Sequence, residues 1–127
     1  MAKRSTSSTI RLAQIAHTRS GDKGNHANIG VVAYTRAGYE YLCRELTAQR
    51  MAAHFAGLAP SPSAPLRVDR YELPGIGALN FVLYDCLGGG ASRSLRIDTQ
   101  GKLLGTAALE IELPRPDGLA EMTRPTS

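Results

Sequence analysis

A polar stretch between two apolar runs is the feature that most constrains how this chain can fold. Residues 17–26 contain no apolar side chain, whereas the segments on either side are rich in Ile, Leu and Val. Such runs are typical of buried strands, so the polar stretch is predicted to be a loop that joins two strands. Gly21 and Gly24 permit positive φ, which would let successive backbone N–H groups turn inward around an anion.

The charged side chains of this loop indicate two kinds of chemistry. Arg19 and Lys23 would supply a guanidinium fork and a point charge for a phosphate or carboxylate. Asp22 beside Lys23 would be suited to acid–base work if the fold positions the pair. The alternative is a polar turn in which Asp22, Asn25 and Asn28 only satisfy backbone groups. Both interpretations stay open at this point.

A second polar cluster lies in the second half of the chain. Asn80 interrupts the apolar segment 78–87, and Gly88–Gly90, Ser92 and Arg93 follow it. Three consecutive glycines cost backbone entropy, which indicates either close approach of the backbone to a ligand or a flexible turn. The pattern is not a Walker A motif, because no Gly-Lys-Ser/Thr follows, and it is not a dinucleotide fingerprint.

Metal ligation and nucleophilic catalysis have weaker support. His17 and His26, with one Asp between them, are too sparse to define a metal site, and His54 falls on a predicted helix. Cys43 and Cys86 lie in apolar patterns, which is typical of buried free thiols in a reducing compartment. We therefore expect no metal and no cysteine nucleophile.

Length and charge narrow the class of protein. The 127 residues are enough for one domain with one core. The net charge of +4 is modest, and the basic residues are scattered among acidic ones. With two Phe and no Trp, the chain also lacks the aromatic residues on which nucleic-acid bases stack. No run approaches the roughly 20 apolar residues of a membrane span, and the polar N-terminus lacks a signal core. We expect a cytoplasmic protein that binds neither nucleic acid nor membrane.

The apolar periodicity predicts an α+β fold, a mostly antiparallel sheet with one long helix packed on one face. Gly57 is expected to end that helix as its C′ residue. Because one helix covers only one face of the sheet, the other face should be apolar enough to be buried in another chain. Strands are expected over 9–17, 28–34, 66–73 and 78–87, the helix over 36–55, a hairpin over 92–98 and 103–113, and loose tails over 1–8 and 114–127.

The two polar clusters also carry a family resemblance. The motifs Arg-Ser-Gly-Asp-Lys-Gly-Asn and Ala-Asn-Ile-Gly within residues 19–30, and the segments 78–83, 87–90 and 92–96, resemble the AtuA-like domain of acyclic terpene utilisation proteins. The similarity covers about residues 9–113. His26 stands where many relatives have an acidic residue. The resemblance implies a ferredoxin-like fold and a small domain that is either fused to a larger AtuA domain or encoded separately.

The resemblance implies the small subunit, or a stand-alone small domain, of an AtuA-like enzyme that acts on a carboxylic or acyl-CoA substrate, and the cationic residues of the two clusters favour an anionic one. The resemblance implies a large AtuA-like subunit as partner, a lyase or hydratase as one reaction class, and no cofactor except CoA as part of the substrate. The alternative is a homo-oligomeric module that binds a small anion without catalysis of its own. Residues 18–28 and 88–93 should then lie close together. The expected site residues are Asp22 and Lys23 for catalysis, with Arg19, Ser20, Gly21, Gly24, Asn25, Asn28, Asn80, Gly89, Gly90, Ser92 and Arg93 for binding.

Overall fold

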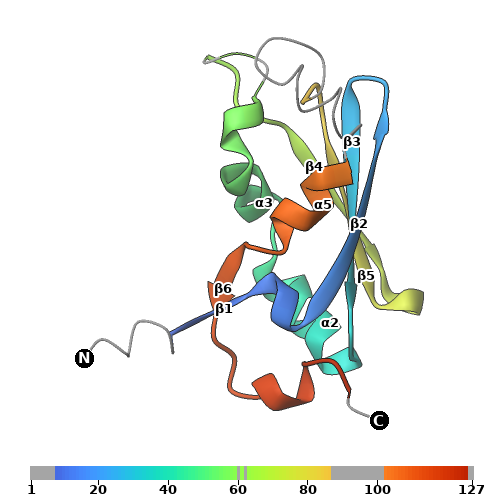
Figure 1. Ribbon diagram of the computed structural model, residues 1–127, viewed down its shortest axis with the longest axis vertical. Coiled ribbons are helices and arrows are strands. Elements are labelled where there is room, and N and C mark those ends of the chain that lie inside the picture. Colours follow the sequence, from blue (N-terminus) through green and yellow to red (C-terminus); the bar gives the residue numbers. More distant parts are fainter. Residues whose placement is uncertain (1–7, 60, 62, 87–101, 126–127) are drawn as a thin grey trace.

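Four antiparallel strands form the main sheet, and the described α-helices pack on one of its faces (Figure 1). The computed structural model describes residues 8–59, 61, 63–86 and 102–125. The strand order is β2-β3-β5-β4, so β3 and β5 are central and β2 and β4 are edges. The elements are β1 (Thr9–Arg11), β2 (Ala16–Lys23), β3 (His26–Ala33), α2 (Arg36–Glu45), α3 (Ala48–His54), β4 (Val68–Leu73), β5 (Ala78–Leu83), α5 (Lys102–Ala108) and β6 (Glu112–Pro114).

The chain order of these elements repeats a β-β-α unit. The first unit is β2, β3 and the pair α2–α3, and the second is β4, β5 and α5. Moving β2 from the beginning to the end of this order gives β-α-β-β-α-β, the order of the ferredoxin-like fold. The predicted ferredoxin-like α+β class with a mostly antiparallel sheet is therefore confirmed.

The core lies between the sheet and the helices. Alternate residues of the two central strands point to the helix side and are almost completely buried, because successive strand side chains face opposite sides of a sheet. They meet apolar side chains from α2, α3, α5 and the β1–β6 pair. The strand residues are Ala27, Ile29, Val31, Leu79, Phe81 and Leu83, and their partners include Leu42, Leu46, Met51, Leu104, Ile10 and Leu113.

The long helix expected over 36–55 consists of two helices. Thr47 begins the second one as its N-cap, and its hydroxyl accepts a hydrogen bond of 3.0 Å from the N–H of Arg50. Arg70 of β4 donates to the carbonyls of Cys43 and Leu46, at 3.0 Å each, where α2 ends. Gly57 is not a left-handed C′ residue; it lies in a 3-10 turn, Ala56–Leu58, without a positive φ.

The expected strand over 103–113 is wrong in its first part. Residues Lys102–Ala108 form α5, and only Glu112–Pro114 are a strand, paired with Thr9–Arg11. The strand expected over 9–17 is likewise divided by a 3-10 turn at Leu12–Gln14. Residues 92–98, the other half of the expected hairpin, lie outside the described residues.

The segment after Pro114 does not form a loose tail. It contains a 3-10 turn, Leu119–Glu121, and the side chain of Met122 is buried with 7% exposed. The hydroxyl of Thr35 donates a hydrogen bond of 2.8 Å to the carbonyl of Glu121, which ties this segment to the start of α2. Among the helices of the described ranges, none is long and apolar enough to span a membrane.

Candidate functional site

The polar stretch over residues 17–26 is part of a β-hairpin. Residues 16–23 of β2 pair with 26–33 of β3, and only Gly24 and Asn25 form the turn between them. Gly24 has the positive φ that the sequence predicts, at 63°, but Gly21 is a strand residue opposite Asn28. Because N–H groups of a strand lie in the plane of the sheet, they do not converge on an anion. The predicted loop with inward-turned N–H groups is therefore wrong, and anion binding by the side chains of this stretch stays a prediction.

The hairpin divides its side chains between two faces, because strand residues alternate. Ser20 and Asp22 are on the helix side, and Arg19 and Gly21 are on the other. The hydroxyl of Ser20 accepts a hydrogen bond of 2.9 Å from the N–H of Gly105 in α5, so Ser20 has a structural contact. Asp22 is exposed at the sheet edge, on the face opposite Arg19.

We call the side of the sheet opposite the helices the open sheet face. Its members follow from the registers of the four strands. They include His17, Arg19 and Gly21 of β2, His26, Asn28, Gly30 and Val32 of β3, Ala78, Asn80 and Val82 of β5, and Asp69, Tyr71 and Leu73 of β4.

Two asparagines meet in the middle of the open sheet face. Nδ2 of Asn28 donates a hydrogen bond of 3.1 Å to Oδ1 of Asn80, and both side chains are half-buried. Gly30 and Gly21 flank the pair and place no side chain over it. A Cβ at Gly30 would lie 4.0 Å from Oδ1 of Asn80, and one at Gly21 would lie 3.8 Å from Oδ1 of Asn28. The glycines thus leave the pair accessible from the open side.

A cavity of about 260 Å³ adjoins the asparagine pair. His26 and Asn28 line it from β3, and Asn80 and Val82 line it from β5, with Ala27 as the remaining member. Polar groups and small apolar side chains therefore share one pocket. Pockets that bind small molecules have this composition, a mostly apolar lining with a few hydrogen-bonding groups.

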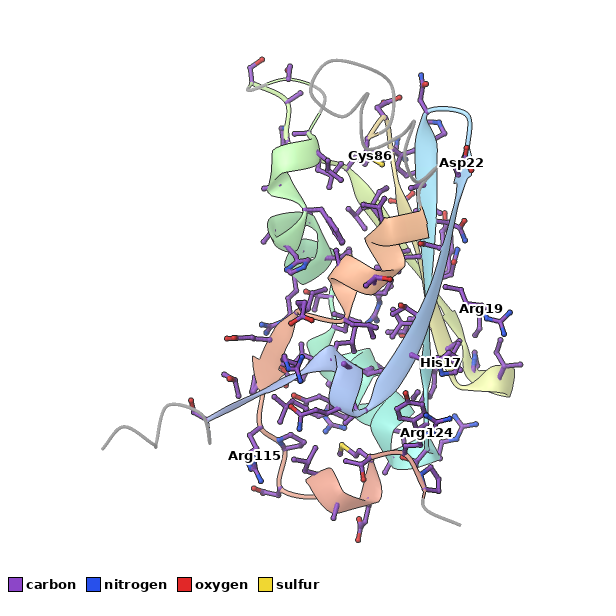
Figure 2. All side chains as sticks on the ribbon, viewed as in Figure 1. His17, Arg19, Asp22, Cys86, Arg115 and Arg124 are labelled. Carbon is purple, nitrogen blue, oxygen red and sulfur yellow. The ribbon has the colours of Figure 1, made fainter. Side chains whose placement is uncertain are left out.

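Arg19 places a positive charge beside the asparagine pair on this face. Its side chain is exposed and points away from the helices (Figure 2). Within the part of the chain that the structure describes, it has no hydrogen bond and no ion pair. Arg19 is opposite Gly30, which is opposite Asn80, so two strand spacings of about 5 Å separate Arg19 from Asn80 at the backbone. The glycine between them leaves that path free of side chains.

The structure thus gathers Arg19, Gly21, Asn28 and Asn80 on one face, although they come from both polar clusters of the sequence. Other members of the expected set lie elsewhere or are not described. Gly24 and Asn25 are at the exposed tip of the hairpin, and Lys23 is opposite His26 at the end of β2. Gly89, Gly90, Ser92 and Arg93 lie outside the described residues, and so does the expected proximity of 88–93 to residues 18–28.

The sequence did not reveal a second polar group at the hairpin end of this face. The hydroxyl of Tyr84 donates a hydrogen bond of 2.9 Å to Oδ2 of Asp69, and the guanidinium of Arg67 stacks over the Tyr84 ring at 4.2 Å. The bond to Asp69 is the main reason that the pKa of Tyr84 rises to about 12, with burial adding to it. The ring of His26 contacts that of Tyr84 edge-on, with centroids 5.1 Å apart. The alternation of β4 predicts that Asp69 and Tyr71 share one face of the strand, but only the pairing with β5 shows that Asp69 lies next to Tyr84.

The histidines and cysteines do not form a catalytic cluster here. His17 and His26 lie at opposite ends of the hairpin, about six strand residues or 20 Å apart. The described ranges contain no group of three side chains able to hold a metal ion. Cys43 and Cys86 are unpaired thiols, and burial raises the pKa of Cys86, which disfavours the reactive thiolate.

The open sheet face is less apolar than expected. Its middle carries the asparagine pair and Arg19, and exposed apolar side chains gather at the end of β4 and in the turn after it. Tyr71, Leu73 and Ile76 have 49%, 43% and 68% of their surface exposed. The face thus combines a polar centre with one apolar end, and its burial in another chain stays a prediction.

Comparison with known proteins agrees with this fold. Residues 10–114 match the family model of the AtuA ferredoxin-like domain. No curated protein and no solved structure was found to match the chain. Since the matched residues make up most of the chain, the protein belongs to the AtuA ferredoxin-like domain family.

Proposed function

We propose that this protein is the small AtuA-like domain of an enzyme that acts on a carboxylic or acyl-CoA substrate, and that the open sheet face binds the substrate. In this proposal Arg19 binds the anionic group of the substrate, and the asparagine pair binds its polar neighbour. Membership of the AtuA family supports the enzymatic context. It does not identify the substrate, which we infer from the chemistry of the face.

One observation carries the proposal: Arg19 has no described partner and lies beside glycines that uncover the Asn28–Asn80 pair. A guanidinium without an internal carboxylate can form the two parallel hydrogen bonds that a ligand carboxylate accepts. The nearest carboxylate of the open face, Asp69, already accepts a hydrogen bond from Tyr84 and pairs with Arg67 at 3.4 Å. The centre of the face therefore attracts an anion.

Pentanoate is a suitable probe for the proposed site. We expect that titration into the 15N-labelled protein shifts the backbone amide signals of Gly21, Asn28, Gly30 and Asn80. Arg19→Ala should weaken binding at least tenfold, because a charge-assisted pair contributes about 1.5–3 kcal/mol. The same variant should keep its melting temperature, since Arg19 has no described contact to lose.

Arg115→Ala is the matched control for this experiment. Arg115 is also an exposed arginine, but it lies beyond β6, on the helix side of the molecule (Figure 2). The control should bind pentanoate as the unaltered protein does. Equal binding by the Arg19 and Arg115 variants, or shifts confined to another surface, would contradict the proposed site. Tighter binding of pentanoyl-CoA than of pentanoate would favour an acyl-CoA substrate over a free acid.

The exposed apolar side chains at one end of the sheet support the proposal that a second protein binds there. Leu73 and Ile76 are large apolar residues next to the open sheet face, and such groups are commonly covered in interfaces. We propose that a large AtuA-like subunit covers this end and completes the enzyme. The alternative is a homo-oligomer that binds a small anion alone. Sedimentation of the purified chain distinguishes them: a monomer at 100 μM favours the large subunit, and a dimer that Ile76→Lys dissociates favours the homo-oligomer.

A further inference from the structure

The cavity beside the asparagine pair contains a histidine that the proposed substrate site does not yet use. His26 is the first residue of β3, and 42% of its side chain is exposed. It lines the 260 Å³ cavity together with Asn28, Asn80 and Val82. That volume is enough for a small acyl group.

The hydrogen bond that His26 receives determines its tautomer. The backbone N–H of Asp85 lies 3.0 Å from Nδ1 of His26. A backbone N–H can only donate, so Nδ1 must offer a lone pair, and the proton of the neutral ring must be on Nε2. Nδ1 also lies 3.9 Å from the Asp85 carboxylate, a contact that is an ion pair only when the ring is protonated.

The backbone at Asp85 contributes to this arrangement. Asp85 is the only described non-glycine residue with a positive φ, at 57°. This conformation is uncommon for a residue with a side chain, and such positions tend to persist where the surroundings require them. The N–H of this same residue is the donor to the imidazole of His26. The edge-on contact between the rings of His26 and Tyr84, with centroids 5.1 Å apart, holds the ring from a second side.

The donors of this cavity are therefore defined. Nε2–H of His26 and the Nδ2 group of Asn80 have no acceptor among the described residues, and Asn28 uses one of its two amide hydrogens on Asn80. Val82 and Ala27 supply an apolar wall. Hydrogen-bond donors beside an apolar wall suit a carbonyl oxygen attached to a short alkyl group.

Resting on the proposed function, we propose that His26 is a specificity residue that donates a hydrogen bond from Nε2 to a carbonyl oxygen of the substrate. Asp85 is then a positioning residue, because its N–H fixes the donor tautomer. Arg19 is opposite Gly30, and four residues, or about 13 Å of β3, separate Gly30 from His26. The extended Arg19 side chain, the ligand and the imidazole must span this distance together. The substrate class is accordingly a small carboxylic acid that bears a second carbonyl group, the acid at Arg19 and the carbonyl at His26.

Levulinate and pentanoate form a matched pair of probes for this inference, because they have the same carbon chain and levulinate adds one ketone at C4. We expect the unaltered protein to bind levulinate about tenfold more tightly, the factor of one good hydrogen bond. His26→Phe should remove this preference, so that the ratio of the two affinities falls to about one. His26→Gln, whose amide donates from a similar position, should restore part of it. His54→Phe, a histidine on the helix side, should change neither affinity.

The outcomes separate the inference from the proposed function. Equal affinity of the unaltered protein for both probes would overturn the role of His26 and leave Arg19 as the anion site. Binding of neither probe would contradict the proposed function, and the inference with it. A preference for levulinate that survives in His26→Phe would also overturn the inference. A 1H–15N spectrum at pH 8.5 should show the Nε2–H tautomer of His26, and the Nδ1–H tautomer would refute the argument without any ligand.

Discussion

Nδ2 of Asn28 donates a hydrogen bond of 3.1 Å to Oδ1 of Asn80, although 52 positions separate the two residues in the sequence. Asn80 is directly opposite Gly30, so Asn28 is its diagonal neighbour across the central strands. This contact joins the two polar clusters of the chain on one face of the sheet. It also orients the amide groups that line the cavity, because each amide oxygen and nitrogen then has a defined role.

The first prediction concerns the energy of this pair. Asn80→Leu removes the acceptor of Asn28, and we expect it to lower the free energy of unfolding by about 1 kcal/mol. Asn28→Leu should have a similar effect. In the double variant no polar group is left unpaired, so its loss should be smaller than the sum by about 0.5–1.5 kcal/mol. Urea denaturation of the four proteins measures this coupling, and strictly additive losses would contradict it.

The second prediction concerns the packing of α5 on β2. A Cβ at Gly105 would lie 2.9 Å from Oγ of Ser20 and 3.1 Å from Oγ1 of Thr18, closer than packed atoms approach. The same hydroxyls hold the helix: Ser20 accepts from the N–H of Gly105, and Thr18 donates to its carbonyl at 2.7 Å. Gly105→Ala should therefore lower the free energy of unfolding by about 1–3 kcal/mol.

Gly57→Ala is the control for that variant. A Cβ at Gly57 would have no neighbouring atom within 4 Å, and Gly57 has no positive φ, so an alanine there meets neither a clash nor backbone strain. Thermal unfolding should show Gly57→Ala within about 1 kcal/mol of the unaltered protein. If Gly105→Ala is as stable as the control, the close contact between α5 and β2 is wrong.

The third prediction concerns Tyr84 at high pH. Its pKa in the folded protein is about 12, above the ordinary 10, mainly because its hydroxyl donates to Asp69. Folding favours the protonated tyrosine, so this contribution to stability is complete below pH 10 and is lost as pH rises through 12. Asp69→Asn should lower the Tyr84 pKa toward 10. The 13Cζ signal of Tyr84 followed from pH 8 to 13 measures this, and an unchanged midpoint in Asp69→Asn would contradict it.

The buried strands could be predicted because the residues that favour them lie within the strands and directly beside them. Residues 28–34 and 78–87 combine β-branched and apolar side chains over a short length with turn residues at their ends, and both contain central strands. The polar strand β2 could not be found in this way. Its helix-side residues Thr18 and Ser20 contact α5 through hydrogen bonds to Gly105, so no apolar alternation marks them.

The helical errors have a similar cause. The apolar stripe over 36–55 continues through Leu46, and only the N-cap bond of Thr47 and the contact of Arg70 with the end of α2 divide it. At the other end, Leu109, Ile111 and Leu113 alternate like a strand, which concealed the helical spacing of the buried Leu104 and Ala108. Of the two contacts that divide the helix over 36–55, the one from Arg70 joins residues far apart in the sequence, and no local pattern shows it.

The candidate site was only partly accessible to sequence reasoning. Arg19, Asn28 and Asn80 were expected to bind ligand, and the structure places them on one face, where their role in binding stays a prediction. His26 was considered as a metal ligand and noted as a departure from its relatives, but it was not among the expected site residues. Its place depends on the N–H of Asp85, 59 positions away, and no local pattern encodes that contact.

The last prediction concerns the segment after Pro114. Met122 is buried, and its Cβ would lie 3.6 Å from a Cβ at Gly38 of α2. Met122→Ala should leave a cavity beside α2 and lower the free energy of unfolding by about 2–3 kcal/mol, whereas Met122→Leu keeps the volume and should cost less than about 1.5 kcal/mol. Truncation after Pro114 should cost more than Met122→Ala, because it also removes the acceptor of Thr35. A loose tail would leave all three variants as stable as the unaltered protein in urea, since residues that contact nothing contribute nothing to unfolding.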